Sequence, residues 1–424
     1  MSKDGFFIPA RMHYPTLWAI DFSMPLILKT ALNIDGIMLS ESDKVELRKL
    51  KKKRVLFLSN HPTTFEPPVT YQISNIMGSR FHFMASRNVF NWGFGMVGEI
   101  ISRIGAFSVL AGGSDKESLK TARKVLSSPE GKLAIYPEGM TGGENDNLVP
   151  FMPGITQIGF WALDDLRKQG SQEEIIVLPT FVKYVLSASA KSQERDIELS
   201  LRRIERKLKI NPSDKNILRR FLTIGRILLE KTETEYHIKV KDKEDYDYRI
   251  GHLRHIILNT AAEKLGFSFA ENRNAIEKLR ELFTISDSFE AGAYDKRKYG
   301  SINPDYLQSA KKEIQLAYLF LVLKPEYILS YPSAERLMEW LYRFETIVLG
   351  ETQYRARKAY VKVGNYFPLN EYYEEYKKNK KKVVEGVTQR LRKEIEQKMQ
   401  ESLSLTSPLF NPYDVGSGTP WNIL

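Results

Sequence analysis

The stretch VLFLSNHPTTFEPPV, residues 55–69, joins a run of apolar residues to a proline-containing loop with one histidine and one glutamate. VLFLS (55–59) is continuous and apolar, as expected of a strand that is buried on both faces of a parallel sheet. Active sites of open α/β sheets gather at the carboxyl ends of such strands. His61 therefore stands at a predicted active-site position, and Glu66 follows five residues later.

Three further apolar runs have the same character: AFSVL (106–110), LAIYP (133–137) and IIVLP (175–179). The stretches 115–128 and 154–169 lie between them and place apolar residues at helical spacing. This alternation of strand and helix patterns predicts an α/β fold with a mostly parallel central sheet that is flanked by helices.

The pattern changes after FVKY (181–184). From about 188 to 352 the sequence is charged and mostly helical in pattern, with predicted helices at 197–210, 216–231 and 334–349. AYVKVGNYF (359–367) then alternates like a strand. The remainder, 371–400, has the pattern of one long amphipathic helix, and the tail after it is rich in Ser, Pro, Gly and Asn.

Composition narrows the possible functions. The 424 residues include no cysteine, which excludes disulfides, thiolate metal sites and cysteine nucleophiles, and favours a reducing compartment. The net charge of +11 suits a protein that meets anions, such as nucleic acid, anionic lipid headgroups or CoA-like substrates. No zinc-finger spacing, RNP motif or heptad basic region accompanies the basic runs, which argues against nucleic acid.

Two long apolar stretches are too polar to span a membrane. Residues 14–34 contain Asp21 and Lys29, and residues 89–107 contain two charged side chains. A spanning helix needs about 20 nearly uncharged residues. We therefore expect a cytoplasmic protein without a spanning helix, peripheral at the inner face of a membrane.

The loop at 60–67 allows acid–base chemistry. Pro62 and Pro67 disfavour the helical conformation at His61 and Glu66, so the loop can turn both side chains together. A carboxylate against one imidazole nitrogen leaves the other free to take a proton from a hydroxyl. No G-x-S-x-G motif lies nearby, so direct attack by a substrate hydroxyl is the simplest chemistry. Two alternatives stay open from this motif alone: a histidine that bonds within its loop, and a metal ligand.

A second stretch, LAIYPEGMTGGENDNLVPFMPGI (133–155), leads a strand into Pro-Glu-Gly, a glycine-rich loop and an apolar-Pro-Gly turn. This order resembles the glycerolipid acyltransferase family, which includes the 1-acylglycerol-3-phosphate O-acyltransferases. That family pairs N-H-x-x-x-x-D with a later aromatic-Pro-Glu-Gly block. GAFSVLA (105–111) and VLPTFVKY (177–184) resemble two further blocks of the family. The corresponding residues of the first two blocks are Asn60, His61, Glu66, Tyr136, Pro137, Glu138, Gly139, Phe151 and Gly154.

The resemblance implies an O-acyltransferase of phospholipid biosynthesis. It would move a fatty acyl group from acyl-CoA or acyl carrier protein to a hydroxyl of a (lyso)glycerolipid or glycerol-phosphate acceptor at a membrane surface. His61 would be the general base and Glu66 would orient it, while Asn60, Glu138 and Gly139 would bind the acceptor. A backbone N–H near the dyad would stabilise the oxyanion, and no metal or bound cofactor is required.

The resemblance also implies a domain layout, because the strand and helix near the C-terminus look like the end of the family's domain. The expected segments are an N-terminal apolar or amphipathic helical segment (1–44), the first part of the acyltransferase domain (45–187), a helical insertion (188–355), the last strand and C-terminal helix of the domain (356–402), and an irregular tail (403–424).

Two departures from the family bear on the acceptor. The family's usual aspartate is Glu66 here, and the arginine expected on the acceptor phosphate is Ala111. A substitute anion site is predicted at the start of the helix after Gly113, with a capping box of Ser114 and Glu117. Lys116, Arg87 and Arg103 would add positive charge to this site. The alternative is a plain loop and helix cap.

The sequence leaves other possibilities open. The chain could be a non-catalytic lipid- or protein-binding relative, or an acyltransferase for a non-phosphorylated lipid or polyol. Trp92, Phe94 and Met96, with the N-terminal apolar stretch, could form an acyl channel or a membrane-docking face. They could equally belong to the core.

Overall fold

A computed structural model of the chain describes residues 7–110, 115–211, 216–292, 294, 304–320 and 323–416. The described residues form two compact units. The first, which we call the α/β unit, contains the residues up to Val185, a short segment that begins at Asp287, and Arg357–Leu403. The second, which we call the helical unit, contains Leu186–Ser286, the described residues from Tyr294 to Ala356, and the chain from Ser404 onward.

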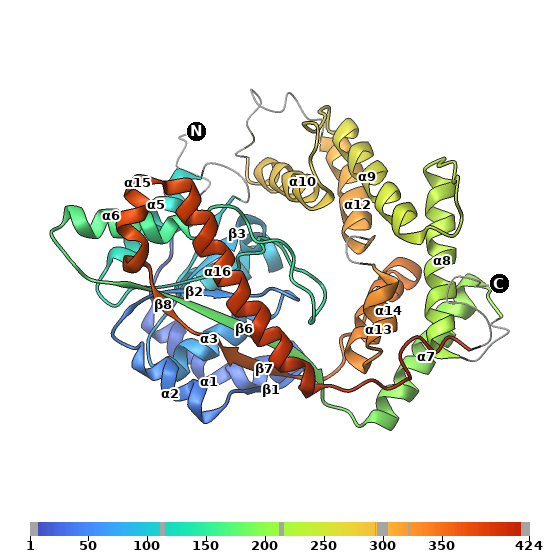
Figure 1. Ribbon diagram of the computed structural model, residues 1–424, viewed down its shortest axis with the longest axis horizontal. Coiled ribbons are helices and arrows are strands. Elements are labelled where there is room, and N and C mark those ends of the chain that lie inside the picture. Colours follow the sequence, from blue (N-terminus) through green and yellow to red (C-terminus); the bar gives the residue numbers. More distant parts are fainter. Residues whose placement is uncertain are drawn as a thin grey trace. The chain divides into compact units, whose positions relative to one another are not determined.

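The α/β unit is built on one mostly parallel sheet, which confirms the predicted fold class (Figure 1). Its described strands run in the order β1-β7-β6-β2-β5-β3-β4, and β8 pairs antiparallel with β6. The strands are β1 (Ile34–Met38), β2 (Arg54–Ser59), β3 (His82–Ser86), β4 (Ala106–Val109), β5 (Lys132–Ile135), β6 (Ile175–Leu186), β7 (Arg357–Val363) and β8 (Phe367–Pro368).

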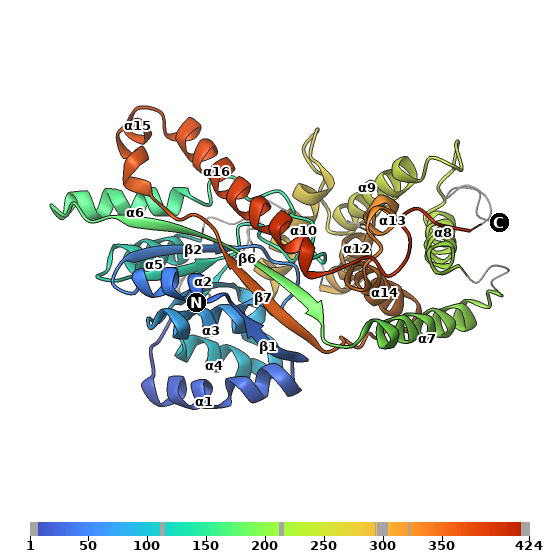
Figure 2. The ribbon, with the colours of Figure 1, turned by 60° about the horizontal axis from the view of Figure 1, so that its bottom comes forward.

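Helices cover both faces of this sheet because side chains alternate between the faces along each strand. On β2, Leu56 and Leu58 join one core, whereas Val55 and Phe57 join the other. Figure 2 shows α5, α6, α15 and α16 on one side of the sheet and α1, α3 and α4 on the other. The helices of this unit are α1 (Tyr14–Thr30), α2 (Glu41–Lys49), α3 (Glu66–Met77), η2 (Arg87–Gly95), α4 (Met96–Arg103), α5 (Lys116–Ser127), α6 (Gln157–Lys168), η3 (Leu369–Tyr372), α15 (Tyr373–Lys378) and α16 (Lys380–Glu401).

The helical unit has a core of its own. Leu201, Phe221, Leu341 and Phe344 are buried in it, and the rings of Phe221 and Phe344 lie 6.1 Å apart. Its described helices are α7 (Ala190–Leu208), α8 (Ile217–Glu235), α9 (Tyr246–Lys264), α10 (Ala275–Glu290, which extends into the α/β unit), α12 (Pro304–Phe320), α13 (Pro325–Ser330) and α14 (Ala334–Leu349). The short helix η4 (Ser402–Leu405) begins in the α/β unit and ends in the helical unit.

Most predicted elements of the α/β unit are present. The four apolar runs are β2, β4, β5 and β6, and FVKY extends β6 into a strand of 12 residues. The stretch 1–44 is not only helical, because it contains the edge strand β1 beside β7. The single C-terminal helix is also wrong: Asn379 has an extended conformation, and its side chain accepts a hydrogen bond from the Lys382 N–H and so starts a second helix.

In the part of the chain that the structure describes, no helix combines the length and the apolar character that crossing a membrane requires.

Candidate active site

His61 and Glu66 meet at the carboxyl end of β2, in the middle of the sheet. His61 Nδ1 lies 2.6 Å from Glu66 Oε2. Among the described residues, none bonds to the opposite ring nitrogen, Nε2, and the side chain is 18% exposed. The structure therefore brings the two predicted residues together and, among the described residues, leaves the second imidazole nitrogen without a hydrogen-bond partner.

The loop itself fixes the Glu66 carboxylate. Thr63 donates to it twice, from its hydroxyl to Oε1 (2.6 Å) and from its backbone N–H to Oε2 (3.2 Å). Glu66 is fully buried and is the first residue of α3, so it is helical despite the proline that follows it. Proline is tolerated in a first helical turn, and the positive end of the helix dipole stabilises a carboxylate there.

The His61 ring is also held from one side. It stacks on the Tyr136 ring, with 4.3 Å between the ring centroids and an angle of 17° between the planes. The hydroxyl groups of Tyr136 and Thr70, the latter on α3, are 2.9 Å apart. Burial raises the pKa of Tyr136 well above its ordinary value, so this tyrosine is a neutral support and not an acid.

Glu138 joins the histidine loop to the loop after β5. Its Oε1 accepts the His61 backbone N–H at 2.7 Å, and its Oε2 accepts the Val149 N–H at 2.8 Å. The side chain is 1% exposed, and burial raises the pKa of Glu138 to about 7 although both hydrogen bonds oppose this. Glu138 was predicted to bind the acceptor, but in this structure both oxygens of its carboxylate accept backbone N–H groups, one of them that of His61.

The glycine-rich loop after Glu138 also bonds to the backbone of the loop that carries His61. The Gly142 N–H donates to the His61 carbonyl at 2.7 Å, and the Gly143 N–H donates to the Pro62 carbonyl at 2.8 Å. Gly139 has φ +65°, and a Cβ atom on it would lie 2.3 Å from the sulfur of Met152. Only glycine fits there without strain, so Gly139 shapes the turn that presents Glu138.

Asn60 extends the sheet beyond the end of β2. Its Nδ2 donates to the Val182 carbonyl at 2.9 Å, and the Val182 N–H donates to its Oδ1 at 2.7 Å. Asn145 makes the same pair of bonds to Tyr184, two residues further along β6. Asn60 was predicted to bind the acceptor, but it is buried and its amide is occupied by β6.

The predicted anion site differs from expectation. Ser114 and Ala111 lie outside the described residues. The N-cap of α5 is Asp115, whose carboxylate accepts the N–H groups of Ser118 (3.1 Å) and Leu110 (3.2 Å). Asp115 therefore supplies the negative charge that a phosphate would have brought to this helix start.

Three basic residues were expected to assist at that site. Lys116 is the first residue of α5, and Arg87 follows β3, so both lie at the carboxyl edge of the sheet, where Arg87 donates to Asn91 Oδ1 at 2.8 Å. Burial lowers the pKa of Arg87. Arg103 is not brought to the site: it precedes β4 at the opposite edge and pairs with Glu99 at 2.8 Å.

The separation of Arg103 follows from the strand register. Ala106, the first residue of β4, is level with Phe83, Ala134 and Phe57 across the parallel strands. His61 lies four residues beyond Phe57, roughly 13 Å further along the strand direction at about 3.3 Å per residue. Arg103 comes before Ala106 and is therefore further away still.

Two residues near the dyad carry no local sequence signal. Tyr184, at the far end of β6, is buried, and ionised Glu66 is among the groups that raise its pKa, after burial. Arg357, the first residue of β7, places its guanidinium 4.9 Å from the centre of the Tyr184 ring. Both lie far from His61 in sequence, and only the sheet order, with β7 and β6 side by side, brings them near.

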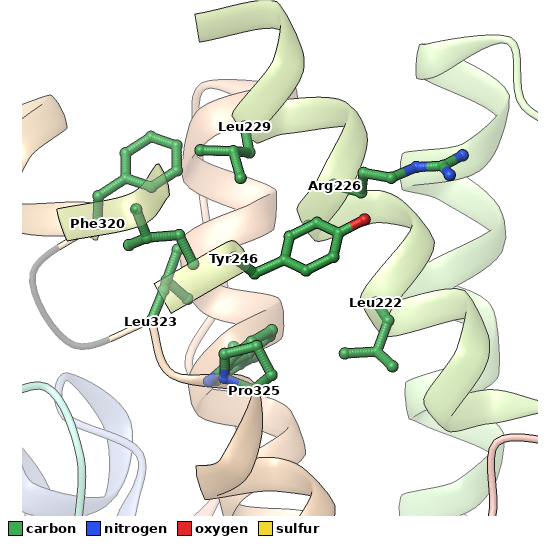
Figure 3. A pocket seen from close by; sticks show the side chains of 10 residues that line it. Leu222, Arg226, Leu229, Tyr246, Phe320, Leu323 and Pro325 are labelled. Atoms are coloured by element: carbon green, nitrogen blue, oxygen red, sulfur yellow. The ribbon is translucent and has the colours of Figure 1, made fainter. Parts of the chain in front are cut away.

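The helical unit contains a pocket of its own, with about 430 Å³ of space between atoms, part of it open to solvent. Figure 3 shows the side chains of Leu222, Leu229, Leu323 and Pro325 around the ring of Tyr246. Arg226 is the charged residue in its lining. Among the described residues that line it, none has a carboxylate or an imidazole side chain.

Within the described ranges, no group of three or more His, Cys, Asp or Glu side chains could hold a metal ion. The chain matches no protein-family model, no curated protein and no solved structure with which it was compared.

Proposed function

We propose that this protein is an O-acyltransferase of the glycerolipid acyltransferase type. It would transfer a fatty acyl group from a thioester, acyl-CoA or acyl carrier protein, to a hydroxyl of a lipid or glycerol-derived acceptor. The observation that carries the proposal is the 2.6 Å contact of His61 Nδ1 with the buried Glu66, with Nε2 left open. The motif order from residue 60 to residue 184 supports the choice of acyl transfer.

The chemistry balances with these two residues. His61 Nε2 takes the proton from the acceptor hydroxyl as its oxygen attacks the thioester carbonyl. Glu66 holds the ring through Nδ1 and stabilises the imidazolium that forms. When the tetrahedral intermediate collapses, the carbon–sulfur bond breaks and the thiolate leaves. The imidazolium returns the proton to the sulfur, so the products are an ester and a free thiol.

Two observations favour an acceptor that has no phosphate at the position where the glycerolipid acyltransferase family binds one. The family's phosphate-binding arginine is Ala111 in this sequence. The nearby start of α5 is capped by Asp115, whose negative charge would repel a phosphate. A monoacylglycerol, another neutral lipid or a polyol is therefore the acceptor class that we prefer to lysophosphatidic acid.

Exposed apolar side chains support action at a membrane surface. On α1, Tyr14, Trp18, Phe22 and Leu26 face solvent at a spacing of four residues, and Phe22 is 92% exposed. The other side of α1 is buried in the unit through Leu17, Met24 and Leu28, and Asp21 pairs with Arg80 at 2.5 Å. Such a rigid helix with an apolar outer stripe is suited to lie in a membrane interface.

The loop and helix after β3 add to this apolar surface. Trp92, Phe94, Met96 and Ile100 are exposed, Phe94 at 108%. α4 contacts α1, so the two sets of side chains belong to one region of the α/β unit. We propose that this surface, defined by the eight apolar residues, binds the membrane peripherally and that the cytoplasmic, inner face is where it does so.

Thiol release with a panel of acceptors tests the proposed reaction. Purified protein is given acyl-CoA or acyl carrier protein with lysophosphatidic acid, glycerol 3-phosphate, monoacylglycerol or a polyol, in the presence of vesicles. We expect His61→Ala to reduce the rate about 10²- to 10⁴-fold, because the general base is lost. Glu66→Gln should also reduce the rate, by up to about 10⁴-fold, because the amide cannot stabilise the imidazolium in the same way.

His13→Ala is the matched control. His13 is exposed at the start of α1, and its Nδ1 is hydrogen-bonded to the Thr16 hydroxyl. Its backbone N–H donates to the Arg103 carbonyl, at the edge of the sheet opposite to His61. This variant should keep the full rate. Acyl transfer that survives His61→Ala would remove the proposed mechanism, and lipid binding without any thiol release would favour the non-catalytic alternative.

A further inference from the structure

Arg357 is a buried cation next to the candidate dyad. It begins β7, the first strand after the helical unit, and only 4% of the residue is exposed. Its guanidinium carbon lies 4.7 Å from the centre of the Phe65 ring and 4.9 Å from that of Tyr184. Arginine held between two aromatic faces gains cation–π attraction that grows as water is excluded.

Both rings are tied to the turn that presents Glu66. Phe65 precedes Glu66 and is the N-cap residue of α3, and its N–H donates to the Thr63 hydroxyl at 3.1 Å. Tyr184 is fixed through its backbone, where Asn145 bonds to its N–H and its carbonyl. Arg357 therefore packs against the residue before the dyad carboxylate on one side and against a rigid strand on the other.

The charges of Arg357 and Glu66 act on the same group. Burial raises the pKa of the Tyr184 hydroxyl, the negative charge of Glu66 raises it further, and the positive charge of Arg357 lowers it. Both side chains are thus close enough to Tyr184 to influence its ionisation. Opposite charges in a buried region attract each other more strongly than they do in water.

A cation beside Glu66 adds to the stabilisation that Thr63 and the start of α3 give this carboxylate. Glu66 is fully buried, and its hydrogen-bond partners are Thr63 and His61. Thr63 carries no charge, and a histidine that acts as a general base must start neutral. An ionised carboxylate is costly to bury unless a positive charge compensates it. Without that compensation, the carboxylate would favour a protonated His61, which could not act as a base.

Other titratable groups also face the dyad. Tyr136 stacks on His61 from the end of β5, and Glu138 binds the His61 N–H from the loop that follows. Tyr184 approaches Glu66 from β6. Of these groups, tyrosine is neutral near pH 7 and a carboxylate can only add negative charge, whereas Arg357 adds positive charge.

We propose that Arg357 is a positioning residue of the His61–Glu66 dyad. It holds the Phe65–Glu66 turn in place and supplies the positive charge that keeps Glu66 ionised while His61 stays neutral. This inference rests on the proposed function for its catalytic meaning, but its electrostatic part can be measured without any turnover.

The first test is the pH dependence of acyl transfer in the full chain. Arg357→Met removes the charge and keeps an apolar side chain between the rings, whereas Arg357→Lys keeps the charge. We expect the acidic limb of the rate profile to move to higher pH by about one unit in Arg357→Met, because the imidazolium is no longer opposed by a cation. Arg357→Lys should keep the limb near its wild-type position.

A purely structural role predicts a different result. The rate would then fall at every pH, and the acidic limb would stay in place in Arg357→Met, which would overturn the inference. Arg357→Gln is the second neutral variant if Arg357→Met does not fold, and circular dichroism checks both. Tyr184→Phe keeps the ring and the cation, so it should leave the limb unchanged.

The second test separates this inference from the proposed function. The ring signals of the six histidines are followed by NMR across pH, and His61→Gln identifies the signal of His61. The pH at which this signal shifts should rise by about one unit in Arg357→Met. If the His61 signal shifts but the protein transfers no acyl group, the proposed function is refuted and the inference about Arg357 stands. If the protein transfers acyl groups but the signal does not shift, the proposed function stands and the inference about Arg357 is refuted.

Discussion

At the scale of single residues, Glu138 shows how a side chain predicted to bind a substrate can act through the backbone. It is buried, and its two oxygens accept the N–H groups of His61 and Val149. Its carboxylate thereby fixes the backbone that carries the imidazole. Burial raises the pKa of Glu138 to about 7, so the residue ionises in the folded protein only near neutral pH.

This pKa predicts how stability depends on pH. Below pH 4.5 the carboxyl group is protonated in both the folded and the unfolded chain. Between pH 4.5 and about 7 it ionises only when the chain unfolds, so the free energy of unfolding falls as pH rises, and above about 7 this change ends. Urea denaturation of wild type and Glu138→Gln from pH 4 to 8 should show the wild type losing stability relative to the variant over that window.

The Gln variant is the reference because it does not titrate. Its amide can accept only one of the two backbone N–H groups, so it should be less stable than wild type at pH 4, by about 1–3 kcal/mol for one lost partner. A stability difference that stays constant with pH would show that Glu138 has an ordinary carboxyl pKa.

The sequence predicted one part of the site and not another. His61 and Glu66 were identified because both lie in one short loop after an obvious strand. Arg357 and Tyr184 were not, because their proximity depends on β7 lying beside β6 after the whole helical unit has intervened. Thr63 lies in the same loop, but a threonine that donates to a carboxylate has no distinctive pattern.

At the scale of elements, burial on both faces made strands easy to recognise. β2, β5 and β6 have continuous apolar runs because helices cover both sides of the sheet. β3 (HFMAS) is only partly buried, and β1 (IDGIM) is an edge strand with Asp35 and Gly36, so neither has that run. The break at Asn379 was missed because the apolar helical spacing continues on both sides of it.

The apolar surface on α1 and on the segment after β3 gives a prediction at this scale. Replacing Trp18, Phe22 and Phe94 by serine should weaken binding to phospholipid vesicles by about 10²-fold or more, because burying one such side chain is worth about 1.5–3 kcal/mol. The fold should survive, since Phe22 and Phe94 are almost fully exposed and Trp18 largely so. Co-sedimentation with vesicles measures the change.

Leu199→Ser is the matched control for that experiment. Leu199 is a half-exposed leucine on α7 in the helical unit, outside the proposed surface. This variant should bind vesicles as wild type does. If the triple variant binds vesicles as strongly as wild type, the eight apolar residues do not form a membrane-binding surface.

At the scale of the whole molecule, the limits predicted for the helical insertion can be compared with those of the helical unit. The predicted limits 188 and 355 fall close to Leu186 and Ala356, where the helical unit begins and where its last segment before β7 ends. The change from apolar runs to charged helical patterns indicated where the helical segment begins, and the resemblance of the later strand and helix to the end of the family's domain supplied the limit at 355. Two features had no such signal: the segment 1–44 belongs to the α/β unit, and the segment that begins at Asp287 returns to it. There, Asp287 accepts hydrogen bonds from Ser86 and Asn88.

The two separate cores predict two separable unfolding transitions. Leu163 on α6 and Leu341 on α14 are both fully buried, one in each unit. Replacing either by alanine should cost about 2–5 kcal/mol in the unit that contains it. Hydrogen exchange measured by mass spectrometry in increasing urea reports each unit from its own peptides. We expect Leu341→Ala to lower the midpoint of the helical unit alone, and Leu163→Ala that of the α/β unit alone. Because the chain passes between the units several times, equal shifts in both units from either substitution would instead show that they unfold as one.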